Sequence, residues 1–438
     1  MDHSSKIFGN LLTIIIIKLA KWLRIDKKKT ISEIVQSDLY YFNFFLFRIF
    51  IQQDEYEKHC ITLTYQRIKY AIYITLNCLL VIIIMSIYLI STENKIIIDL
   101  KYIEEGLSIQ RADIVIMCVI SVFCISECEF IGLLSKVLKY RSGFHDFIHK
   151  YLNFNDQRLT SNDIHYLKQY HLSLKITGII FTVLVIPGLS FVYLCEIGLV
   201  VWFYFKNIIT STQLILTTIM LVSSGFHIGF LITSLQISTL SVAFCTEFLK
   251  LRSRQSLKFL KSNHCPKRIL IRKFQWNSFH REYVNLFQQT ALLNKTISFQ
   301  LYIGELGSKV SSITTCVFYS RQISMGISNT FIFGAMISVF VYITGLYTQL
   351  TYLPAYNQQC CRLLLEWMAR QSIKNKTKKQ RKMIYASIKS NLFTQTMNQN
   401  KFGFHCGQIF FITKFKVFEL ILMNIPLILL FYKKISKN

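Results

Sequence analysis

Acidic residues and proline are scarce in this chain of 438 residues. It has 23 Asp and Glu against 50 Lys and Arg, which gives a formal net charge of +27, and it has only 4 Pro. Nucleic-acid-binding proteins are also basic, but they carry their basic residues on a water-soluble surface. Here 52% of the residues are hydrophobic, and they occur in blocks of about 20 residues separated by basic stretches. This pattern excludes a nucleic-acid partner and is typical of a polytopic membrane protein in contact with the lipid bilayer.

The sequence also lacks the short motifs of common enzymes. It contains no G-x-x-x-x-G-K-[ST] phosphate loop, no G-x-S-x-G nucleophile turn and no dinucleotide-binding glycine pattern. His145 and His149 are spaced for one helical face, but the further histidine boxes that a membrane desaturase needs for two irons do not occur. The other histidines are scattered singly. We therefore expect no catalytic residues, no metal site and no cofactor.

The 12 cysteines do not follow a disulfide or zinc pattern. No C-x-x-C pair occurs, and Cys124 and Cys128 lie within an apolar block. Cys265, Cys360 and Cys361 fall in basic stretches between the blocks, where we predict loops. We interpret the cysteines as small buried hydrophobic side chains.

Seven apolar segments have a composition that predicts transmembrane helices. They cover residues 71–91, 113–134, 174–196, 212–245, 297–320, 326–353 and 417–432. At 1.5 Å per residue, the first is long enough for one crossing. The fourth is too long for one crossing, so we expect its excess to project as helix into the aqueous phase. The fifth is weak because it contains Glu305 and Lys309, and the seventh is short.

Two acidic residues stand out inside the second segment. Carboxylates within a membrane are costly and usually functional, which favours a functional role for Glu127 and Glu129. A position near the cytoplasmic end of the helix, where loop lysines reach them, accounts for both residues equally well. The sequence leaves these two interpretations open.

The distribution of basic residues predicts the orientation. The stretches before the first segment and after the second, fourth and sixth segments carry 39 Lys and Arg, and the alternate stretches carry 8. Because basic loops stay in the cytoplasm, we predict a cytoplasmic N-terminus and, with seven spans, an extracellular C-terminus. Lys433, Lys434 and Lys437 in the tail go against this rule. The glycosylation sequence at Asn294 would then lie in the cytoplasm and stay unmodified.

The C-terminal residues carry a resemblance to a known family. Phe402, Gly407, Phe410 and Phe411 fit a pattern of aromatic residues around a glycine. Further on, residues 425–429 are hydrophobic, and Leu430 stands before Phe431 where the family has Gln. With these residues the chain resembles a divergent member of the arthropod gustatory receptor family, within the insect odorant and gustatory chemoreceptor superfamily.

The resemblance implies a function and an assembly. It implies a chemosensory receptor of the plasma membrane that acts as a ligand-gated cation channel, is built from four identical or related subunits and binds a small tastant or odorant-like molecule. In that family the last helix is split: its first part packs in a cytoplasmic anchor and its second part lines the pore. A pore helix faces water on one side, so it can be short and polar without a lipid penalty.

The resemblance also assigns candidate site residues. Phe402, Gly407, Phe410 and Phe411 form the anchor motif, and the pore and gate are formed by Asn424, Leu427, Leu430 and Phe431. The ligand pocket is expected in the outer half of the bundle, at Phe191, Tyr193, Thr330 and Phe333.

Together these observations divide the chain into four regions. Residues 1–70 form a cytoplasmic N-terminal region with interfacial helices at 7–17 and 38–51. Residues 71–353 hold the first six transmembrane helices, residues 354–416 form the anchor region, and residues 417–438 hold the pore-type helix and a short external tail. Two amphipathic stripes predict helices that meet partners in the anchor: Tyr283, Leu286, Phe287, Leu292 and Leu293, and then Leu364, Leu365, Trp367 and Met368.

The alternative function is a secondary transporter of small molecules. Transporters of similar size usually consist of two homologous halves with broken helices in matching places, and no such repeat is visible in the sequence. A second alternative concerns residues 417–432 alone, which would then be a buried helix of the bundle rather than a pore helix.

Overall fold

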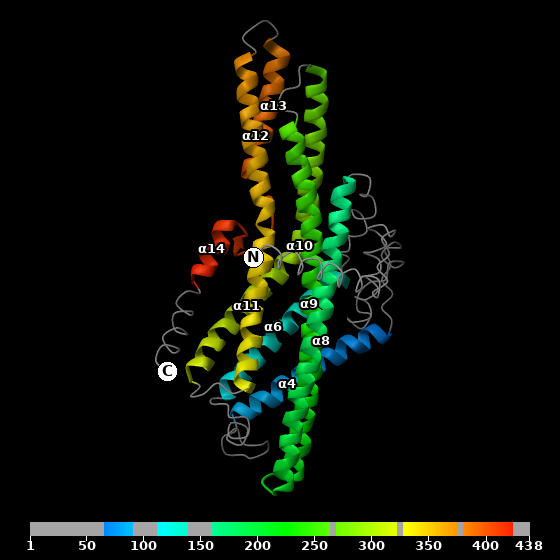
Figure 1. The fold of residues 1–438 in the computed structure, drawn as a ribbon, viewed down its shortest axis with the longest axis vertical. Coiled ribbons are helices and arrows are strands. Elements are labelled where there is room, and N and C mark those ends of the chain that lie inside the picture. Colours follow the sequence, from blue (N-terminus) through cyan, green and yellow to red (C-terminus); the bar gives the residue numbers. More distant parts are fainter. Residues whose placement is uncertain are drawn as a thin grey trace, which may run out of the picture.

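The computed structural model describes residues 65–90, 112–138, 159–262, 269–321, 327–374 and 380–423. These residues form long helices and one short hairpin, so the predicted all-helical class is confirmed for them (Figure 1). The elements are α4 (Tyr65–Ile90), α6 (Ala112–Leu138), α8 (Ser161–Phe205), α9 (Ser211–Ser262), α10 (Ile269–Arg321), α11 (Ile327–Leu350), α12 (Tyr352–Lys374), α13 (Gln380–Gln399), β1 (His405–Cys406), β2 (Phe410–Phe411) and α14 (Lys414–Met423). The predicted interfacial helices at 7–17 and 38–51, and the pair His145 and His149, lie outside the described residues.

The molecule is elongated, and the helices divide it along its length (Figure 1). α4, α6 and α11 lie in the lower half beside the antiparallel pair α8 and α9. α12 and α13 extend to the upper end together with the second half of α9 and the first half of α10. We call this upper group, residues 242–262, 269–301, α12 and α13, the distal bundle.

The predicted spans 71–91 to 326–353 overlap α4, α6, α8, α9, α10 and α11. Among the described residues, two helical segments, Asp113–Gly132 and Ser211–Phe230, are long and apolar enough to cross a membrane. Shorter apolar segments lie at Ala71–Ile87 and Tyr193–Phe205. The number of crossings and the orientation of the termini stay predictions.

Several helices extend well beyond the apolar segments. α8 begins at Ser161, where Thr160 is the N-cap and its hydroxyl accepts a hydrogen bond from the Asp163 backbone N–H. α9 continues to Ser262, as expected from its excess length. Where the structure describes them, the stretches that the sequence predicts as loops are therefore largely helical. Hydropathy marks only the apolar part of a helix, and the polar part is stabilised by packing and capping.

A tight turn joins α8 to α9 at the lower end. Asn207 adopts a positive φ of 54°, a conformation that Asn tolerates better than most residues. Thr210 then starts α9 in a reciprocal capping arrangement: its N–H donates to Gln213 Oε1 at 2.8 Å, and the Gln213 N–H donates to Thr210 Oγ1 at 3.3 Å.

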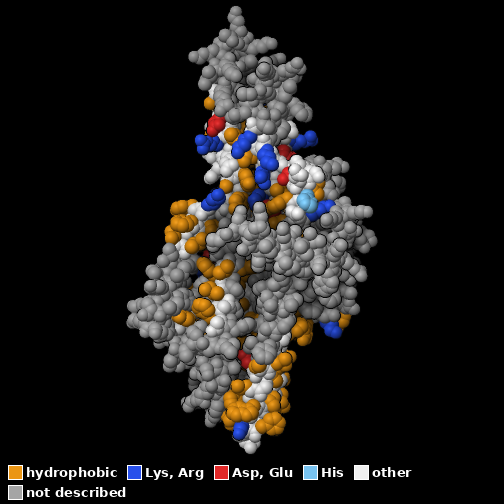
Figure 2. Space-filling model, in the orientation of Figure 1, with side chains coloured by type: hydrophobic (Ala, Val, Ile, Leu, Met, Phe, Trp, Pro, Cys, Tyr) orange, Lys and Arg blue, Asp and Glu red, His pale blue; other side chains and the backbone are white. Residues whose placement is uncertain are grey.

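The lower half exposes apolar side chains on its outside. Cys78 and Val81 of α4 pack with Phe123 and Met220 in a buried cluster. The opposite face of α4 exposes Ile72, Leu76, Leu79, Leu80 and Ile83. In the view of Figure 2, hydrophobic side chains dominate the lower part of the molecule, whereas most of the visible Lys and Arg lie over its upper part. Soluble monomers rarely expose apolar patches of this extent.

The distal bundle has an apolar core that includes most of the first predicted stripe and Leu364 of the second. Tyr283, Leu286 and Leu293 are buried there, and so is Leu364. Leu365 of the second stripe is 55% exposed in the single chain, so its predicted contact with a partner stays a prediction. Phe287, Leu292 and Met368 are half-buried, and the side chain of Trp367 lies outside the described part.

Cys360 and Cys361 lie in a helix and not in the predicted loop. The surrounding basic residues predicted a loop, but both cysteines lie in α12 and are buried in the core of the distal bundle. Burial raises the pKa of the Cys360 thiol to about 12 and that of Cys361 to about 11. The view of cysteines as small buried hydrophobic side chains therefore holds for this pair.

Candidate functional site

The C-terminal aromatic motif folds as a hairpin. β1 and β2 pair antiparallel, with His405 opposite Phe411 and Cys406 opposite Phe410. A further backbone bond from Ile412 N–H to Phe404 O at 2.9 Å extends the pairing. Three of the four motif residues, Phe402, Phe410 and Phe411, therefore lie at the start of the hairpin or within its second strand.

Phe402 fixes the hairpin to the distal bundle. It is almost fully buried, and its ring stacks on Tyr283 at 5.6 Å and on Phe287 at 6.2 Å between centroids. Both partners belong to the first predicted stripe on α10. Such aromatic pairs contribute about 0.5–1.5 kcal/mol beyond their buried area.

Gly407, the fourth motif residue, forms the turn of the hairpin against α10. Its φ of 55° is in the left-handed region, and a Cβ there would lie 3.1 Å from Tyr302 Cβ. Its N–H donates to the Ser298 carbonyl of α10 at 2.8 Å. Glycine is needed here both for the backbone conformation and for the close approach to α10.

Asn294 of α10 binds the first strand of the hairpin. Its Oδ1 accepts from the His405 backbone N–H at 3.0 Å, and its Nδ2 lies 3.1 Å from His405 Nδ1. In this geometry the Asn294 amide donates to an unprotonated Nδ1. Burial, with a smaller contribution from Lys401, lowers the pKa of His405, which favours this neutral ring.

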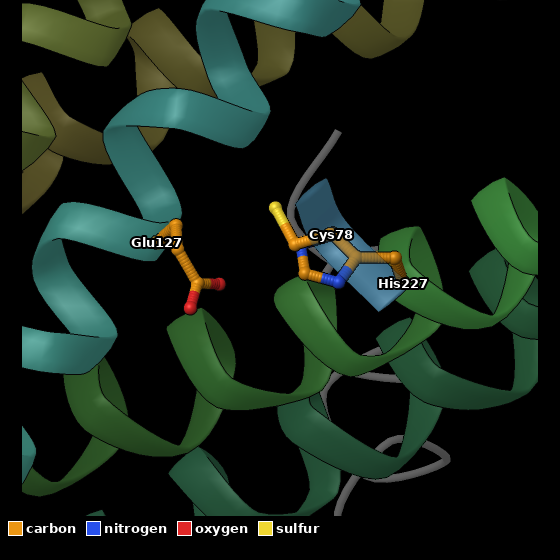
Figure 3. A group of neighbouring side chains, drawn as sticks. All are labelled: Cys78, Glu127 and His227. Carbon is orange, nitrogen blue, oxygen red and sulfur yellow. The ribbon is translucent and has the colours of Figure 1, made fainter. Parts of the chain in front are cut away.

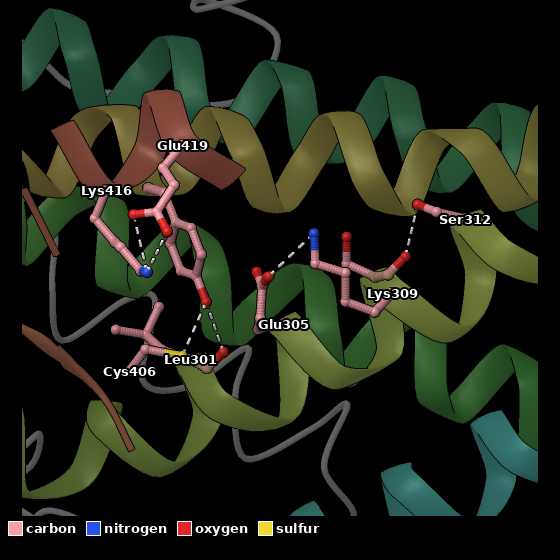
Figure 4. A network of polar contacts seen from close by, with 9 residues as sticks. Leu301, Glu305, Lys309, Ser312, Cys406, Lys416 and Glu419 are labelled. Carbon is pink, nitrogen blue, oxygen red and sulfur yellow. Dashed lines mark hydrogen bonds and ion pairs between the residues drawn. The ribbon is translucent and has the colours of Figure 1, made fainter. Parts of the chain in front are cut away.

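Tyr347 at the end of α11 joins the hairpin to α10 from the other side. Its hydroxyl donates to the Leu301 carbonyl at 3.0 Å and lies 3.3 Å from Cys406 Sγ (Figure 4). Cys406 is fully buried, and burial raises the pKa of its thiol to about 11. The hairpin is thus held on two sides by α10 and α11.

Two ion pairs in or beside the apolar segments form within single helices (Figure 4). Lys309 lies 3.6 Å from Glu305 on α10, and Lys416 lies 3.0 Å from Glu419 on α14. These pairs explain how the weak fifth segment and the start of the seventh tolerate charge. Lys414 is placed over the ring of Tyr352 at 5.8 Å.

α14 leaves the hairpin with an exposed apolar surface. Val417 is its buried contact, whereas Phe415 is 76%, Phe418 58% and Met423 64% exposed. In Figure 1 α14 projects sideways from the body at the base of the distal bundle. The expected pore and gate residues Asn424, Leu427, Leu430 and Phe431 follow directly, outside the described residues, and their role stays a prediction.

A second group of polar side chains is buried in the lower half, between α4, α6 and α9. Glu127 accepts a hydrogen bond from Thr75 Oγ1 at 2.6 Å, and Asn77 Nδ2 donates to the Ser223 carbonyl at 3.1 Å. Cys78 and His227 lie beside Glu127 (Figure 3). The contact with Thr75 shows that Glu127 meets a neighbouring helix inside the bundle.

The expected ligand-pocket residues divide between two helix interfaces. Tyr193 of α8 packs its ring against Gly225 of α9, and its hydroxyl lies 3.4 Å from Ser224 Oγ. The ring of Phe333 of α11 packs on the ring of Tyr319 of α10, with 5.5 Å between the ring centroids. Thr330 is exposed, and the side chain of Phe191 lies outside the described part. A shared pocket for the four residues stays a prediction.

A charged cluster lies where the distal bundle meets the lower half. The buried Glu247 accepts hydrogen bonds from Lys250 at 2.9 Å and from the Tyr166 hydroxyl at 3.1 Å. Arg252, which is also buried, pairs with Glu282 of α10. Burial, with Glu247 nearby, raises the pKa of Tyr170 to about 12.

Sequence reasoning missed the importance of Asn294 and His227. In the sequence, Asn294 stands out only as part of a glycosylation sequence, and His227 is one of the scattered histidines. The sequence feature that could have pointed to them is a polar residue among apolar ones. Such a residue needs a hydrogen-bond partner when it is buried. Which partner it finds depends on helix packing, since His405 lies 111 residues beyond Asn294.

Comparison with known proteins shows similarity to a solved structure but no sequence match. No protein-family model matches the sequence, and no curated protein matches it. Among solved structures, the chain is similar to the insect olfactory receptor OR5 from Machilis hrabei, determined in complex with eugenol. The sequence identity is 13% and the TM-score is 0.45, and the similarity covers 97% of this chain and 100% of that one.

Proposed function

We propose that this chain is a subunit of a chemosensory receptor, of the gustatory type that its C-terminus resembles, and that it acts as a ligand-gated cation channel. It spans the plasma membrane seven times, with the N-terminus in the cytoplasm and the C-terminus outside. The distal bundle is the cytoplasmic anchor. Four copies, or copies of related chains, surround a central pore.

The observation that carries this proposal is the junction between the hairpin and α14. The motif residues Phe402 and Gly407 both contact α10 and hold the hairpin against it. These contacts support the resemblance of the C-terminal motif to that of the receptor family. α14 then projects from the body with Phe415, Phe418 and Met423 exposed. Apolar side chains at the start of a pore helix are covered when subunits assemble around an axis.

The membrane location rests on the outer surface of the lower half. The exposed apolar face of α4 would contact lipid, and the basic distal bundle would face water on the cytoplasmic side. Charges near the apolar segments are neutralised in the pairs Glu305–Lys309 and Glu419–Lys416, which reduces the cost of bringing them close to the membrane.

The ligand is a small, mostly apolar molecule of the tastant or odorant type. Tyr193 offers an aromatic ring and a hydroxyl at the interface of α8 and α9, and Phe333 offers a ring at the interface of α10 and α11. Such groups bind an apolar ligand and fix its orientation with few polar contacts. Alanine at Tyr193 or Phe333 should shift the midpoint of the dose–response curve at equal surface expression. An unchanged midpoint in both variants would place the ligand elsewhere.

Asn424, Leu427 and Leu430 recur at helical spacing and would face the pore. A narrow apolar ring closes a pore because it does not hold a continuous column of water. Leu430→Gln should therefore wet the constriction and raise the leak current without ligand, whereas Leu429→Gln, one position around the helix, should not. Equal leak currents in wild type and Leu430→Gln, at equal surface expression, argue against a pore in this helix and favour the secondary transporter.

A further inference from the structure

The buried polar group in the lower half contains three potential metal ligands from three helices: Cys78 of α4, Glu127 of α6 and His227 of α9. One ligand atom from each side chain lies within 4.8 Å of the other two. All three side chains are buried, and in Figure 3 they converge on the space between the helices. We propose that Cys78, Glu127 and His227 form a binding site for a zinc ion.

The separation of these atoms suits a small tetrahedral ion. Zinc binds sulfur at about 2.3 Å and nitrogen or oxygen at about 2.0–2.2 Å, so tetrahedral ligands lie about 3.5 Å apart. Small rotamer changes bring atoms within 4.8 Å of one another to that spacing. Three protein ligands also leave the fourth position of the tetrahedron for water or another ligand.

His227 provides the second, independent observation. It is 2% exposed, and its Nε2 is buried without a hydrogen-bond partner. A buried polar atom without a partner is rare because nothing compensates for the loss of its hydration. Coordination to a metal would satisfy a ring nitrogen that the protein alone leaves unsatisfied.

The charges of the three ligands match a divalent ion. A Cys78 thiolate and a Glu127 carboxylate carry two negative charges, and a neutral His227 ring carries none. The complex with Zn²⁺ is therefore neutral overall, which lowers the cost of burying it between apolar helices. The Cys78 proton is released to water when the ion binds. Sulfur and imidazole ligands favour zinc over Ca²⁺ and Mg²⁺, which prefer oxygen.

Thr75 positions one of the ligands. Its hydroxyl donates to Glu127 Oε1 at 2.6 Å, which leaves Oε2 for the ion. Partners of this kind orient metal ligands, and their loss lowers metal affinity about 10- to 100-fold. The site would tie α4, α6 and α9 together. It does not depend on the proposed channel function, because metal binding can be measured without any current.

The test uses the purified full-length chain in lipid nanodiscs, stripped with a chelator and titrated with Zn²⁺ and with Co²⁺ as a spectroscopic probe. We expect one ion per chain and a thiolate-to-Co²⁺ charge-transfer band. Cys78→Ser should abolish this band, and Glu127→Gln and His227→Ala should weaken binding by more than about 100-fold. Thr75→Val should weaken binding less, by about 10- to 100-fold.

Cys118→Ser and His171→Ala are matched controls, since both remove buried residues of the same types outside the cluster, and both should bind like wild type. If a ligand variant does not fold, the wild-type titration remains decisive. A folded wild-type chain that shows no thiolate band, or that keeps the band in Cys78→Ser, would overturn the proposal.

Discussion

Gly407→Ala is the sharpest perturbation of the hairpin that leads into the last helix. The backbone at this position has φ of 55°, which costs a residue with a Cβ about 1–2 kcal/mol. The new Cβ would also lie 3.1 Å from Tyr302 Cβ, a tight contact that adds to this cost. The equilibrium between docked and undocked hairpin should therefore shift toward the undocked state by about 5- to 30-fold.

Maleimide labelling of Cys406, mapped by mass spectrometry of the intact chain in detergent, measures this shift. In the docked hairpin the thiol is fully buried, and its pKa is raised to about 11. Labelling therefore requires opening, and its rate should rise about 5- to 30-fold in the variant. Cys245 of α9, which is also buried, should keep its labelling rate.

Two further variants separate strain from general destabilisation. Gly345→Ala, where a Cβ meets nothing within 4 Å, should leave Cys406 protected. Gly407→Asn should restore part of the protection, because Asn tolerates the left-handed conformation. Unchanged Cys406 labelling in Gly407→Ala would show that this glycine does not hold the hairpin.

Three further outcomes follow from the same contacts. Asn294→Ala removes both bonds to His405, should lower the free energy of unfolding by about 1–3 kcal/mol and should raise Cys406 labelling; equal labelling would refute the contact. The pKa of His405 is lowered in the folded state, so its contribution is present above the unfolded value of about 6.5 and is lost as the pH falls through the lower, folded pKa. The thermal midpoint should therefore drop more steeply between pH 7 and pH 5 in wild type than in His405→Gln, and parallel curves would contradict this assignment. Glu282→Gln removes the charge that pairs with the buried Arg252 and should cost about 3–5 kcal/mol by denaturant unfolding, and a cost near zero would argue against the pair.

The sequence predicted the helical class and the apolar stripe on 278–296 because both follow from local periodicity. Tyr283, Leu286 and Leu293 recur on one helical face, and the structure buries all three. The limits of the helices were less predictable. Hydropathy detects only the apolar part of α9, whereas its polar continuation to Ser262 is helical because it packs on α10 and α12.

The contacts of the sites depend on tertiary packing, which local patterns do not encode. Cys78, Glu127 and His227 come from separate apolar segments and meet only when α4, α6 and α9 pack together. Basic neighbours predict a loop at Cys360 and Cys361, although one buried face is enough to keep α12 in the core. Leu365 is exposed in the single chain, since an apolar residue does not always face the interior of its own chain.

The central claim, that this chain forms a ligand-gated cation channel, is tested most directly by recording from the purified chain in planar lipid bilayers. A channel predicts discrete unitary current steps far above the turnover of a carrier, selective for cations. Neutralising Lys433 and Lys434 should increase inward cation current, more at low salt than at high, because positive charge at the mouth opposes cation entry. A reconstituted, folded protein that moves solute without unitary steps, with currents indifferent to Leu430→Gln and to the neutralised lysines, would contradict the account.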